Sequence, residues 1–297
     1  MYEVLIVGAG PAGLTAAVYA CRAGFSTLVL GGLPGGQIAS TSLVENYPGF
    51  LSVFGPDLSD KLLEHARAAG AEFRQEDAEA FDLDGEVKTV RTSSGEYRAK
   101  TVIIAQGSSR RKLGIPGEEE FLGRGVSYCA TCDGNFFRGR TVAVVGGGSS
   151  AVGDAIELAA LCKKVYLLHR RDTLRAEYSL VQRAKKLPNL EMVFQAVPVR
   201  IEGAGKVESV TVRQGGGERK IPVAGVFVAI GVVPNIRNLP ASLPLADGYL
   251  DAPETCVTPV PGVFVAGDLR KKNLYQIVTA VADGANAAHS AQSYLQR

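Results

Sequence analysis

The sequence predicts an α/β protein with two nested, Rossmann-like dinucleotide-binding domains. Two glycine-rich turns, residues 8–13 and 146–151, each follow a strand-like apolar run and precede an Ala-rich, helix-like segment. That context is the dinucleotide-binding fingerprint, in which a strand runs through the turn into a helix. A third observation is the Cys-x-x-Cys pair Cys129 and Cys132, a few residues before the second turn. A dithiol beside such a turn indicates electron transfer between a cofactor and sulfur.

Composition excludes several classes of function. The 297 residues are 46% apolar and 21% charged, which is typical of globular proteins and sufficient for two domains. A net charge of +2 and only 7% aromatic residues give no footprint for nucleic acid or acidic lipid. No apolar run approaches the roughly 20 residues that span a bilayer. Tyr2 leads directly into the apolar run 4–7, and five cysteines are too few for a secreted disulfide scaffold, so we expect a reducing, cytoplasmic location.

The first βαβ unit comprises a strand at 2–7, a helix at 14–23 and a second strand at 27–30. In the turn between the first strand and the helix, Gly8 permits the tight bend, Gly10 lets the backbone approach a pyrophosphate, and Gly13 lets the helix pack on the strand. An irregular Gly/Pro-rich stretch follows from 31 to 56. The sequence then predicts a helix at 56–69, short strands between 73 and 97, and a strand at 101–105.

The segment Cys129-Ala130-Thr131-Cys132-Asp133-Gly134 predicts dithiol chemistry. Two cysteines at this spacing can close a small disulfide, and redox enzymes lower the thiolate pKa of such pairs to roughly 7 or below. The alternative is half of a zinc site, which needs two further Cys or His ligands at matching spacing. The remaining cysteines and histidines are scattered along the chain: Cys21, Cys162, Cys256, His65, His169 and His289.

The second βαβ unit comprises a strand at 141–145, the turn Gly146-x-Gly148-x-x-Ala151, a helix at 151–161 and a strand at 165–168. Two such units imply two dinucleotides. The second strand ends in His169-Arg170-Arg171, with Arg175 close behind, and guanidiniums suit the bidentate recognition of a 2′-phosphate. NADP is therefore expected rather than NAD, the alternative being a solvated basic loop.

Strands at 207–213 and 226–230 complete the second unit, and Pro234, Pro240 and Pro244 mark a linker. A buried strand ending in the acidic turn Gly267-Asp268 and a final helix at about 275–292 follow. This order favours nesting of the second unit inside the first over a simple tandem.

Together these residues resemble the low-molecular-weight thioredoxin reductases over nearly the full length. The segments that carry the resemblance are residues 8–13, Gly35-Gly36-Gln37, residues 45–49, residues 129–134, the turn at 146–151, His169-Arg170-Arg171 with Arg175, residues 229–231, and Gly267-Asp268. The resemblance implies two three-layer ββα domains, with the NADPH domain inserted in the FAD domain. The expected divisions are 1–113 and 241–297 for FAD and 114–240 for NADPH and the dithiol.

The resemblance also implies the site residues. The residues expected at FAD are Gly8, Gly10, Ala12, Gly13, Gly36, Gln37, Asn46, Gly267, Asp268, Gln276 and Ile277. Those expected at NADPH are Gly146, Gly148, Ser149, Ser150, Ala151, His169, Arg170, Arg171, Arg175, Ile230 and Gly231. Cys132 would face the flavin, Cys129 would attack the partner disulfide, and Asp133 would manage protons, although an acid before a glycine is often only a turn former. No metal is expected.

The resulting function is a flavoprotein that passes a hydride from NADPH to FAD, and electrons on to the Cys129–Cys132 disulfide and then to a thioredoxin-like or glutaredoxin-like protein. A homodimer is expected. Alternatives are a flavin dithiol oxidase, a reductase fed by ferredoxin, and a non-catalytic redox-sensing module that binds nucleotides. Three positions depart from the usual family pattern: Tyr275 replaces an arginine before Gln276, Gln106 replaces a threonine, and Gly153 replaces an acidic residue.

Overall fold

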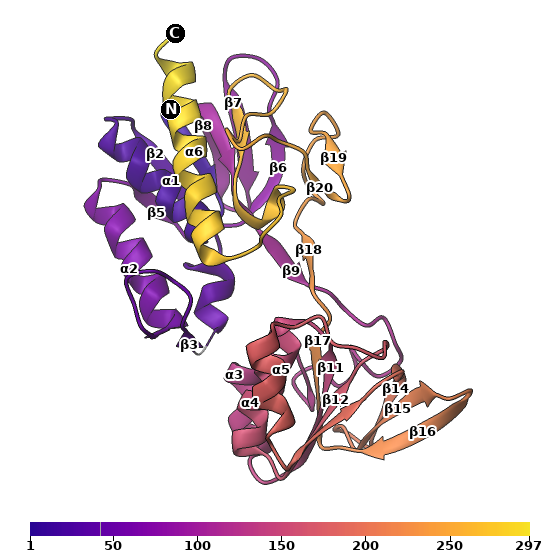
Figure 1. Cartoon of the computed structure of the whole chain (residues 1–297). Helices are drawn as coiled ribbons and strands as arrows, with labels where there is room; N and C mark the ends of the chain where they lie inside the picture. Colours follow the sequence, from indigo (N-terminus) through magenta and orange to yellow (C-terminus); the bar gives the residue numbers. More distant parts are fainter. Residues whose placement is uncertain (42) are drawn as a thin grey trace. The chain divides into compact units, whose positions relative to one another are not determined.

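The computed structural model describes residues 1–41 and 43–297, which form two compact units (Figure 1). Unit 1 contains Met1–Ser109 and Pro234–Arg297, and unit 2 contains Arg110–Val233. Unit 2 is therefore inserted in the sequence of unit 1. The chain crosses between the units in two short strands, β9 (Ser108–Arg110) and β18 (Val232–Pro234), which pair with each other.

Unit 1 is organised by a seven-stranded sheet in the order β5-β2-β1-β8-β7-β6, with β21 also paired to β8. Its strands are β1 (Tyr2–Val7), β2 (Thr27–Leu30), β5 (Glu72–Arg74), β6 (Ala78–Asp82), β7 (Lys88–Thr92), β8 (Gly95–Ile104) and β21 (Val263–Val265). The long strand β8 serves two layers, because its first half pairs antiparallel with β7 and its second half pairs parallel with β1 and β21.

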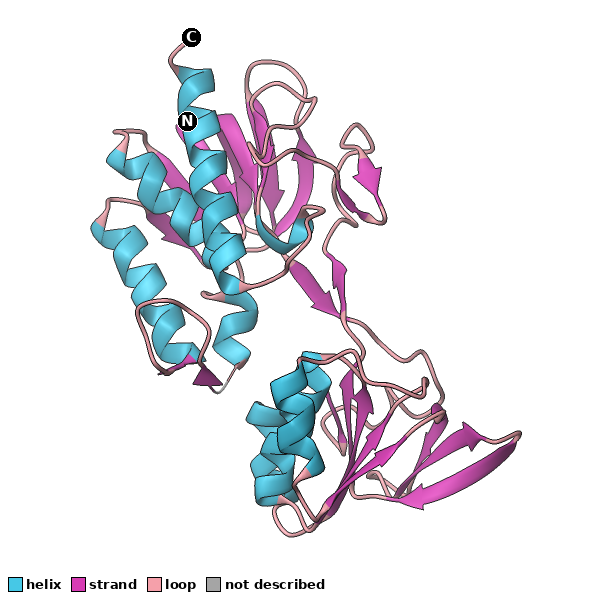
Figure 2. Ribbon diagram, viewed as in Figure 1, coloured by secondary structure: helices cyan, strands magenta, loops and turns pink. Residues whose placement is uncertain are grey.

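Helices cover one face of the parallel strands of unit 1 (Figure 2). They are α1 (Pro11–Arg22), α2 (Gly55–Ala68) and α6 (Ile277–Leu295), and short 3-10 turns occupy η1 (Gly36–Ser40) and η3 (Gly267–Leu269). Val4 and Ile6 of β1 pack in a cluster with α1 and α6, whereas Leu5 and Val7 pack on the opposite face with Val90 of β7. Alternation along one strand therefore builds both interfaces of a three-layer ββα unit. Small hairpins are formed by β3 (Leu43–Val44) with β4 (Val53–Phe54) and by β19 (Leu245–Ala246) with β20 (Tyr249–Leu250).

Unit 2 repeats this architecture around a five-stranded parallel sheet in the order β10-β17-β11-β12-β13. The strands are β10 (Val126–Ser127), β11 (Thr141–Gly146), β12 (Lys164–Leu168), β13 (Leu190–Val193) and β17 (Gly225–Ala229). The helices are α3 (Ala130–Asp133), η2 (Gly134–Phe137), α4 (Ser149–Leu161) and α5 (Tyr178–Lys185). An antiparallel meander of β14 (Val197–Glu202), β15 (Ser209–Gln214) and β16 (Gly217–Pro222) forms the third layer.

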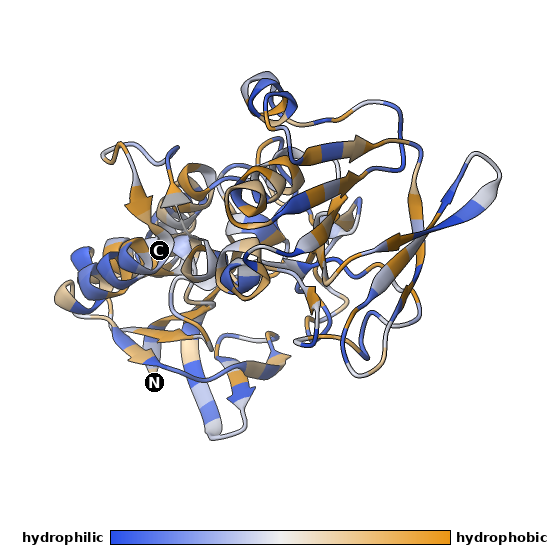
Figure 3. Cartoon of the chain, turned by 90° about the horizontal axis from the view of Figure 1, so that it is seen from below, coloured by the Kyte–Doolittle hydropathy of each residue, from blue (hydrophilic) through white to orange (hydrophobic). Residues whose placement is uncertain are grey.

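The core of unit 2 is divided by its sheet in the same way. Val142 and Val144 of β11 pack with helix α4, and Ala143 and Val145 pack with the meander. Hydrophobic stretches accordingly run along the strands in Figure 3. The predicted α/β class, with two Rossmann-like parallel sheets, is confirmed.

Candidate active site

The first glycine turn joins β1 to α1 at the carboxyl edge of the unit 1 sheet. Gly8 has a φ of +117°, and a Cβ there would lie 2.1 Å from the carbonyl oxygen of Ala105. A Cβ on Gly13 would lie 1.8 Å from the Gly8 carbonyl oxygen, so helix and strand can meet only without one. Nothing lies within 4 Å of a Cβ on Gly10, the N-cap of α1. Gly10 therefore leaves room for a phosphate group at the helix N-terminus.

Other residues expected at FAD gather against this turn. A Cβ on Gly36 would lie 3.4 Å from Cα of Gly10, and one on Gly267 would lie 2.9 Å from Cβ of Ala12. The amide of Gly35 donates to the carbonyl oxygen of Ala9 at 2.7 Å. Segments from three distant parts of the sequence thus meet at one edge of the sheet.

Asn46 is linked to the start of the last helix, 230 positions away in the sequence. Its Nδ2 donates to Oε1 of Gln276 at 2.9 Å. Gln276 is the N-cap of α6, forms a capping box with Thr279, and precedes Ile277, the first helical residue. Gln37 is fixed separately, since its Nε2 donates to the carbonyl oxygen and to Oγ of Ser108 at 3.1 and 2.9 Å.

A buried ion cluster adjoins Asp268, and the sequence analysis did not find it. Asp283 of α6 accepts from Arg270 Nη2 at 2.7 Å and from Lys272 Nζ at 3.2 Å, and its Oδ2 also accepts from the amide of Gly267 at 3.0 Å. Lys272 Nζ lies 3.4 Å from Oδ1 of Asp268. Burial raises the pKa of Asp268, and the Lys272 charge opposes that rise. The signal in the sequence was an aspartate inside an Ala-rich, otherwise apolar helix.

Two buried side-chain oxygens of unit 1, one on Gln106 and one on Asp268, suit a hydroxyl-bearing cofactor. Among the described residues, Oε1 of Gln106 is buried without a hydrogen-bond partner, and Oδ1 of Asp268 is buried with Lys272 Nζ at 3.4 Å but no hydrogen bond of good geometry. Buried acceptors are normally satisfied, so such atoms indicate a missing donor. With the open backbone at Gly10, they make unit 1 a fitting cradle for the ribityl and pyrophosphate groups of FAD.

The second glycine turn joins β11 to α4 in unit 2. A Cβ on Gly146 would lie 2.3 Å from the carbonyl oxygen of Ala229, and Ala151 fills the third fingerprint position in full burial. Gly148, the N-cap of α4, has nothing within 4 Å of its Cβ position. Ser149 and Ser150 begin the helix, and Ser149 Oγ accepts from the amide of Glu177 at 3.1 Å. The open amides again suit a pyrophosphate.

The arginines expected to select NADPH lie beside this turn. Arg170, Arg171 and Arg175 are exposed, and the amide of Arg175 donates to the carbonyl oxygen of Gly147 at 2.7 Å. Within the described part of the chain, none of the three guanidiniums is in an ion pair with a carboxylate. They are therefore available for a phosphate group.

His169 is placed differently from its neighbours. Its ring is buried under the turn, so that a Cβ on Gly147 would lie 2.2 Å from its Nδ1. Burial lowers its pKa, and the three arginines lower it further. Ile230 and Gly231 follow β17 directly beside the turn, and the Gly231 carbonyl oxygen accepts from the amide of Arg111 at 2.9 Å.

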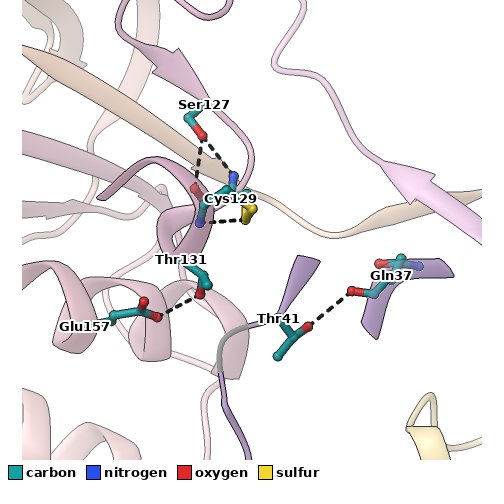
Figure 4. Close-up of a disulfide and its surroundings, with 7 residues drawn as sticks. Gln37, Thr41, Ser127, Cys129, Thr131 and Glu157 are labelled. Atoms are coloured by element: carbon teal, nitrogen blue, oxygen red, sulfur yellow. Dashed lines mark hydrogen bonds between the residues drawn. A yellow bond between two sulfur atoms is a disulfide. The ribbon is translucent and has the colours of Figure 1, made fainter. Parts of the chain in front are cut away.

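The dithiol is closed as a disulfide between Cys129 and Cys132, with an S–S distance of 2.07 Å. Cys129 is the N-cap of the short helix α3, and its Sγ accepts from the Cys132 amide at 3.1 Å. The amide of Cys129 donates to Ser127 Oγ at 3.0 Å (Figure 4). Cys129 is half-buried and Cys132 is exposed, and Asp133 follows at the end of α3 with its amide bonded to the Cys129 carbonyl oxygen at 3.2 Å.

Two contacts around the disulfide were not predicted. Ser127 of β10 bonds both backbone polar groups of Cys129: its Oγ accepts from the Cys129 amide and donates to the Cys129 carbonyl oxygen at 3.2 Å. Thr131, between the two cysteines, donates to Glu157 of α4 at 3.1 Å. These contacts could not be predicted from the sequence, because a serine or a threonine forms them only once the fold has brought its partner close.

Within residues 1–41 and 43–297, no helix is both long and apolar enough to cross a bilayer. In the same residues, no group of three or more His, Cys, Asp or Glu side chains is arranged to hold a metal ion.

Comparison with known proteins identifies the family. Residues 2–284 match the family model described as pyridine nucleotide-disulphide oxidoreductase. A thioredoxin reductase of Bacillus subtilis is 47% identical over 100% of this chain and 95% of its own length. Thioredoxin reductase structures from Lactococcus lactis (FR conformation) and T. acidophilum superpose with TM-scores of 0.95 and 0.94, at 39% and 37% identity, over 100% of this chain and 99% of each of theirs. The chain therefore belongs to the pyridine nucleotide-disulphide oxidoreductase family.

Proposed function

We propose that this protein is an NADPH-dependent thioredoxin-disulfide reductase. The observation that carries the proposal is the Cys129–Cys132 disulfide, which is built into the same unit as a nucleotide turn flanked by exposed arginines. Full-length similarity to thioredoxin reductases supports it.

FAD would be held by unit 1. Gly8, Gly10, Ala12 and Gly13 would carry its pyrophosphate at the N-terminus of α1, with Gly36 and Gly267 closing around the turn. Asp268 would accept from a ribityl hydroxyl through its buried oxygen. The remaining contacts would come from Gln37, Asn46, Gln276 and Ile277.

NADPH would be held by unit 2. Gly146, Gly148, Ser149, Ser150 and Ala151 would carry the pyrophosphate at the N-terminus of α4. Arg170, Arg171 and Arg175 would bind the 2′-phosphate through charge-assisted hydrogen bonds. His169 would support the turn from below, with Ile230 and Gly231 beside it.

When bound, NADPH and FAD supply a hydride and a two-electron relay. The chain's own contribution is the Cys129–Cys132 disulfide, which takes up two electrons and two protons and becomes two thiols. The Cys129 thiolate then attacks the partner disulfide, which forms a mixed disulfide and releases one partner thiolate. Cys132 attacks Cys129 in turn, which re-forms the protein disulfide and releases the second partner thiolate. Asp133, at the end of α3, would take and return the proton of the dithiol.

The partner would be a thioredoxin or a glutaredoxin-like dithiol protein. A homodimer and a cytoplasmic location are part of the same proposal. Cys21, Cys162 and Cys256 are free thiols, two of them buried, which fits a reducing compartment. Light scattering of the purified protein would determine the oligomeric state.

Anaerobic titration of the purified yellow protein tests the function. We expect stoichiometric NADPH to bleach the flavin absorbance, NADH to bleach it only at far higher concentration, and added thioredoxin to restore the colour. Bleaching by thioredoxin and dithiothreitol but not by NADPH would favour a ferredoxin-fed reductase, and fast recovery with oxygen alone would favour a dithiol oxidase. A flavin that never cycles with a disulfide would indicate a sensing module.

A further inference from the structure

The middle of the Cys-x-x-Cys segment is tied to a carboxylate. The hydroxyl of Thr131 donates to Oε2 of Glu157 at 3.1 Å in a partly buried contact (Figure 4). Thr131 directly precedes Cys132 and lies two residues after Cys129. A carboxylate of α4, distant in sequence, is therefore hydrogen-bonded to a residue that lies between the two cysteines.

Packing fixes the position of this carboxylate. A Cβ on Gly134 would lie 3.1 Å from Cδ2 of Leu158 and 3.3 Å from Cδ1 of Leu161, so η2 lies directly on α4. Ala130 of α3 is buried in the same apolar cluster as Ala155 of α4. Glu157, next to Leu158, is consequently oriented toward α3 by the register of a buried helix.

The charge next to the dithiol is not neutralised by an ion pair. In the described part of the chain, no Lys, Arg or His side chain is in a salt bridge with Glu157. On α3, η2 and α4 themselves, the other charged groups are Asp133 and Asp154. The cations nearby are Arg138 after η2, Arg110, which interacts with Asp154, and Arg183 and Lys185 of α5, which packs on α4. The charged residues of α3, η2 and α4 are thus all carboxylates.

We propose that Glu157 is a positioning residue that keeps the Cys129–Cys132 dithiol strongly reducing. An anion near a thiol disfavours its thiolate and raises its pKa, whereas the neutral disulfide is affected far less. When two thiols become a disulfide they release two electrons and two protons. A carboxylate that destabilises the thiolate therefore favours this oxidation, and so favours delivery of electrons to a partner. The inference deepens the proposed reductase function and rests on it.

Glu157→Gln tests the charge and keeps a hydrogen-bond acceptor for Thr131. We expect the pKa of the more reactive thiol to fall by about half a unit to one unit. The equilibrium constant with dithiothreitol at pH 9 should shift about threefold to tenfold toward the reduced dithiol, which corresponds to about 15 to 30 mV. The shift should shrink toward zero at pH 6, because both thiols are then protonated in both proteins. A purely structural role would not produce that pH dependence.

The measurement uses the reduced holoenzyme. Alkylation by iodoacetamide between pH 6 and pH 10 would be followed by mass spectrometry of the peptide that contains Cys129 and Cys132, so that the other cysteines do not contribute. Glu218→Gln is the matched control, because it removes one carboxylate from β16 of the same unit, where Glu218 pairs with Arg200 at 2.9 Å. Its thiol pKa should equal that of the wild type. Flavin absorbance and melting temperature confirm folding.

Three outcomes separate the possibilities. A lowered thiol pKa in Glu157→Gln, but not in Glu218→Gln, supports the proposal. An unchanged or raised pKa overturns it, as does a Glu157→Asp variant, which retains the charge, that behaves like the glutamine variant. Thioredoxin reduction by NADPH in the wild type is assayed separately, so failure of the reductase function is distinguished from failure of the charge effect.

Discussion

In the proposed function, Cys132 is the sulfur that receives electrons from the flavin. Cys132→Ser removes the disulfide but leaves every residue of the two nucleotide turns in place. We expect the variant to retain FAD and to accept a hydride from NADPH, yet to lose thioredoxin reduction to the background rate, because no acceptor sulfur faces the flavin. Stopped-flow flavin bleaching and a thioredoxin turnover assay check the two halves of this expectation. Cys21→Ser is the control, and near-wild-type turnover in Cys132→Ser would refute the assignment.

Tyr275, which directly precedes the N-cap of α6, has a packing role in unit 1. Its ring lies 5.1 Å from that of Tyr249, and Lys272 Nζ lies 5.7 Å from its centre. Tyr275→Arg would lose an aromatic pair of about 0.5 to 1.5 kcal/mol and place a second cation beside Lys272. We expect a lower melting temperature and no faster flavin reduction in stopped flow. Tyr275→Phe, which keeps the ring and loses the long bond from the Lys272 amide to the hydroxyl at 3.4 Å, should stay close to wild-type stability. Faster reduction in the arginine variant would instead mean that Tyr275 slows hydride transfer.

Residue-level contacts were predictable only where a local motif defines them. The glycines and the dithiol could be predicted because each lies in a short motif whose spacing alone determines the local turn or disulfide. Thr131 and Glu157 are 26 positions apart, and Arg270 and Asp283 are 13 apart. Their contacts depend on how the helices pack, and no local sequence pattern specifies that packing. His169 was predicted with the basic cluster, but the structure buries its ring.

At the scale of elements, we predict that the loop after β12 decides whether NADPH or NADH is bound. Replacing Arg170 and Arg171 with glutamine should raise the KM for NADPH far more than that for NADH. Each charge-assisted phosphate hydrogen bond contributes roughly 1.5 to 3 kcal/mol, or about tenfold to 150-fold in affinity. Steady-state kinetics with both nucleotides measure the ratio. Arg183→Gln, an exposed arginine of α5, is the control, and an unchanged NADPH preference in the double variant would make the loop mere surface charge.

Asp154 of helix α4 makes the free energy of unfolding depend on pH. Burial raises its pKa to about 6, Arg110 opposes the rise, and Glu157 adds to it. The folded protein therefore keeps this proton at pH values where the unfolded chain, with a pKa near about 3.9, has lost it. Stability contributed by this group consequently falls as pH rises from about 4 to about 6 and stays lower above that window.

Asp154→Asn removes the ionisation and keeps the shape. We expect the variant to exceed the wild type in unfolding free energy by about 1 to 3 kcal/mol at pH 7.5, and by much less at pH 4.5. Denaturant unfolding at both pH values measures the difference. An advantage of equal size at the two values would contradict the raised pKa.

The bounds of helices and strands with continuous apolar runs could be predicted. Short or exposed elements, and helix starts set by a cap, could not. Strands β1 and β2 match the expected ranges because each contains at least three successive residues that are apolar and buried. Helix α1 begins at Pro11 rather than residue 14, since Gly10 caps it and proline suits the first turn. Helix α5 was missed because it is only eight residues long, and β16 was missed because its side chains are mostly exposed.

At the scale of the whole molecule, unit 2 should be an independent domain. It has a core on each face of its own sheet, and its two ends, β9 and β18, are adjacent. Residues 110–233 expressed alone should unfold in one cooperative transition and bind NADP⁺ in calorimetry. A chain that lacks a thermal transition would show that unit 2 requires the rest of the protein.

The late position of β21 and α6 has a consequence for biosynthesis. Unit 1 cannot complete its sheet until β21 pairs with β8, nor its helical layer until α6 packs on α1, where a Cβ on Gly284 would lie 2.1 Å from the Ala12 carbonyl oxygen. Unit 2 is finished well before those residues leave the ribosome. The N-terminal half of unit 1 therefore waits, with its apolar face uncovered, while the inserted domain folds, and this interval is when the nascent chain is most exposed to aggregation and most dependent on chaperones.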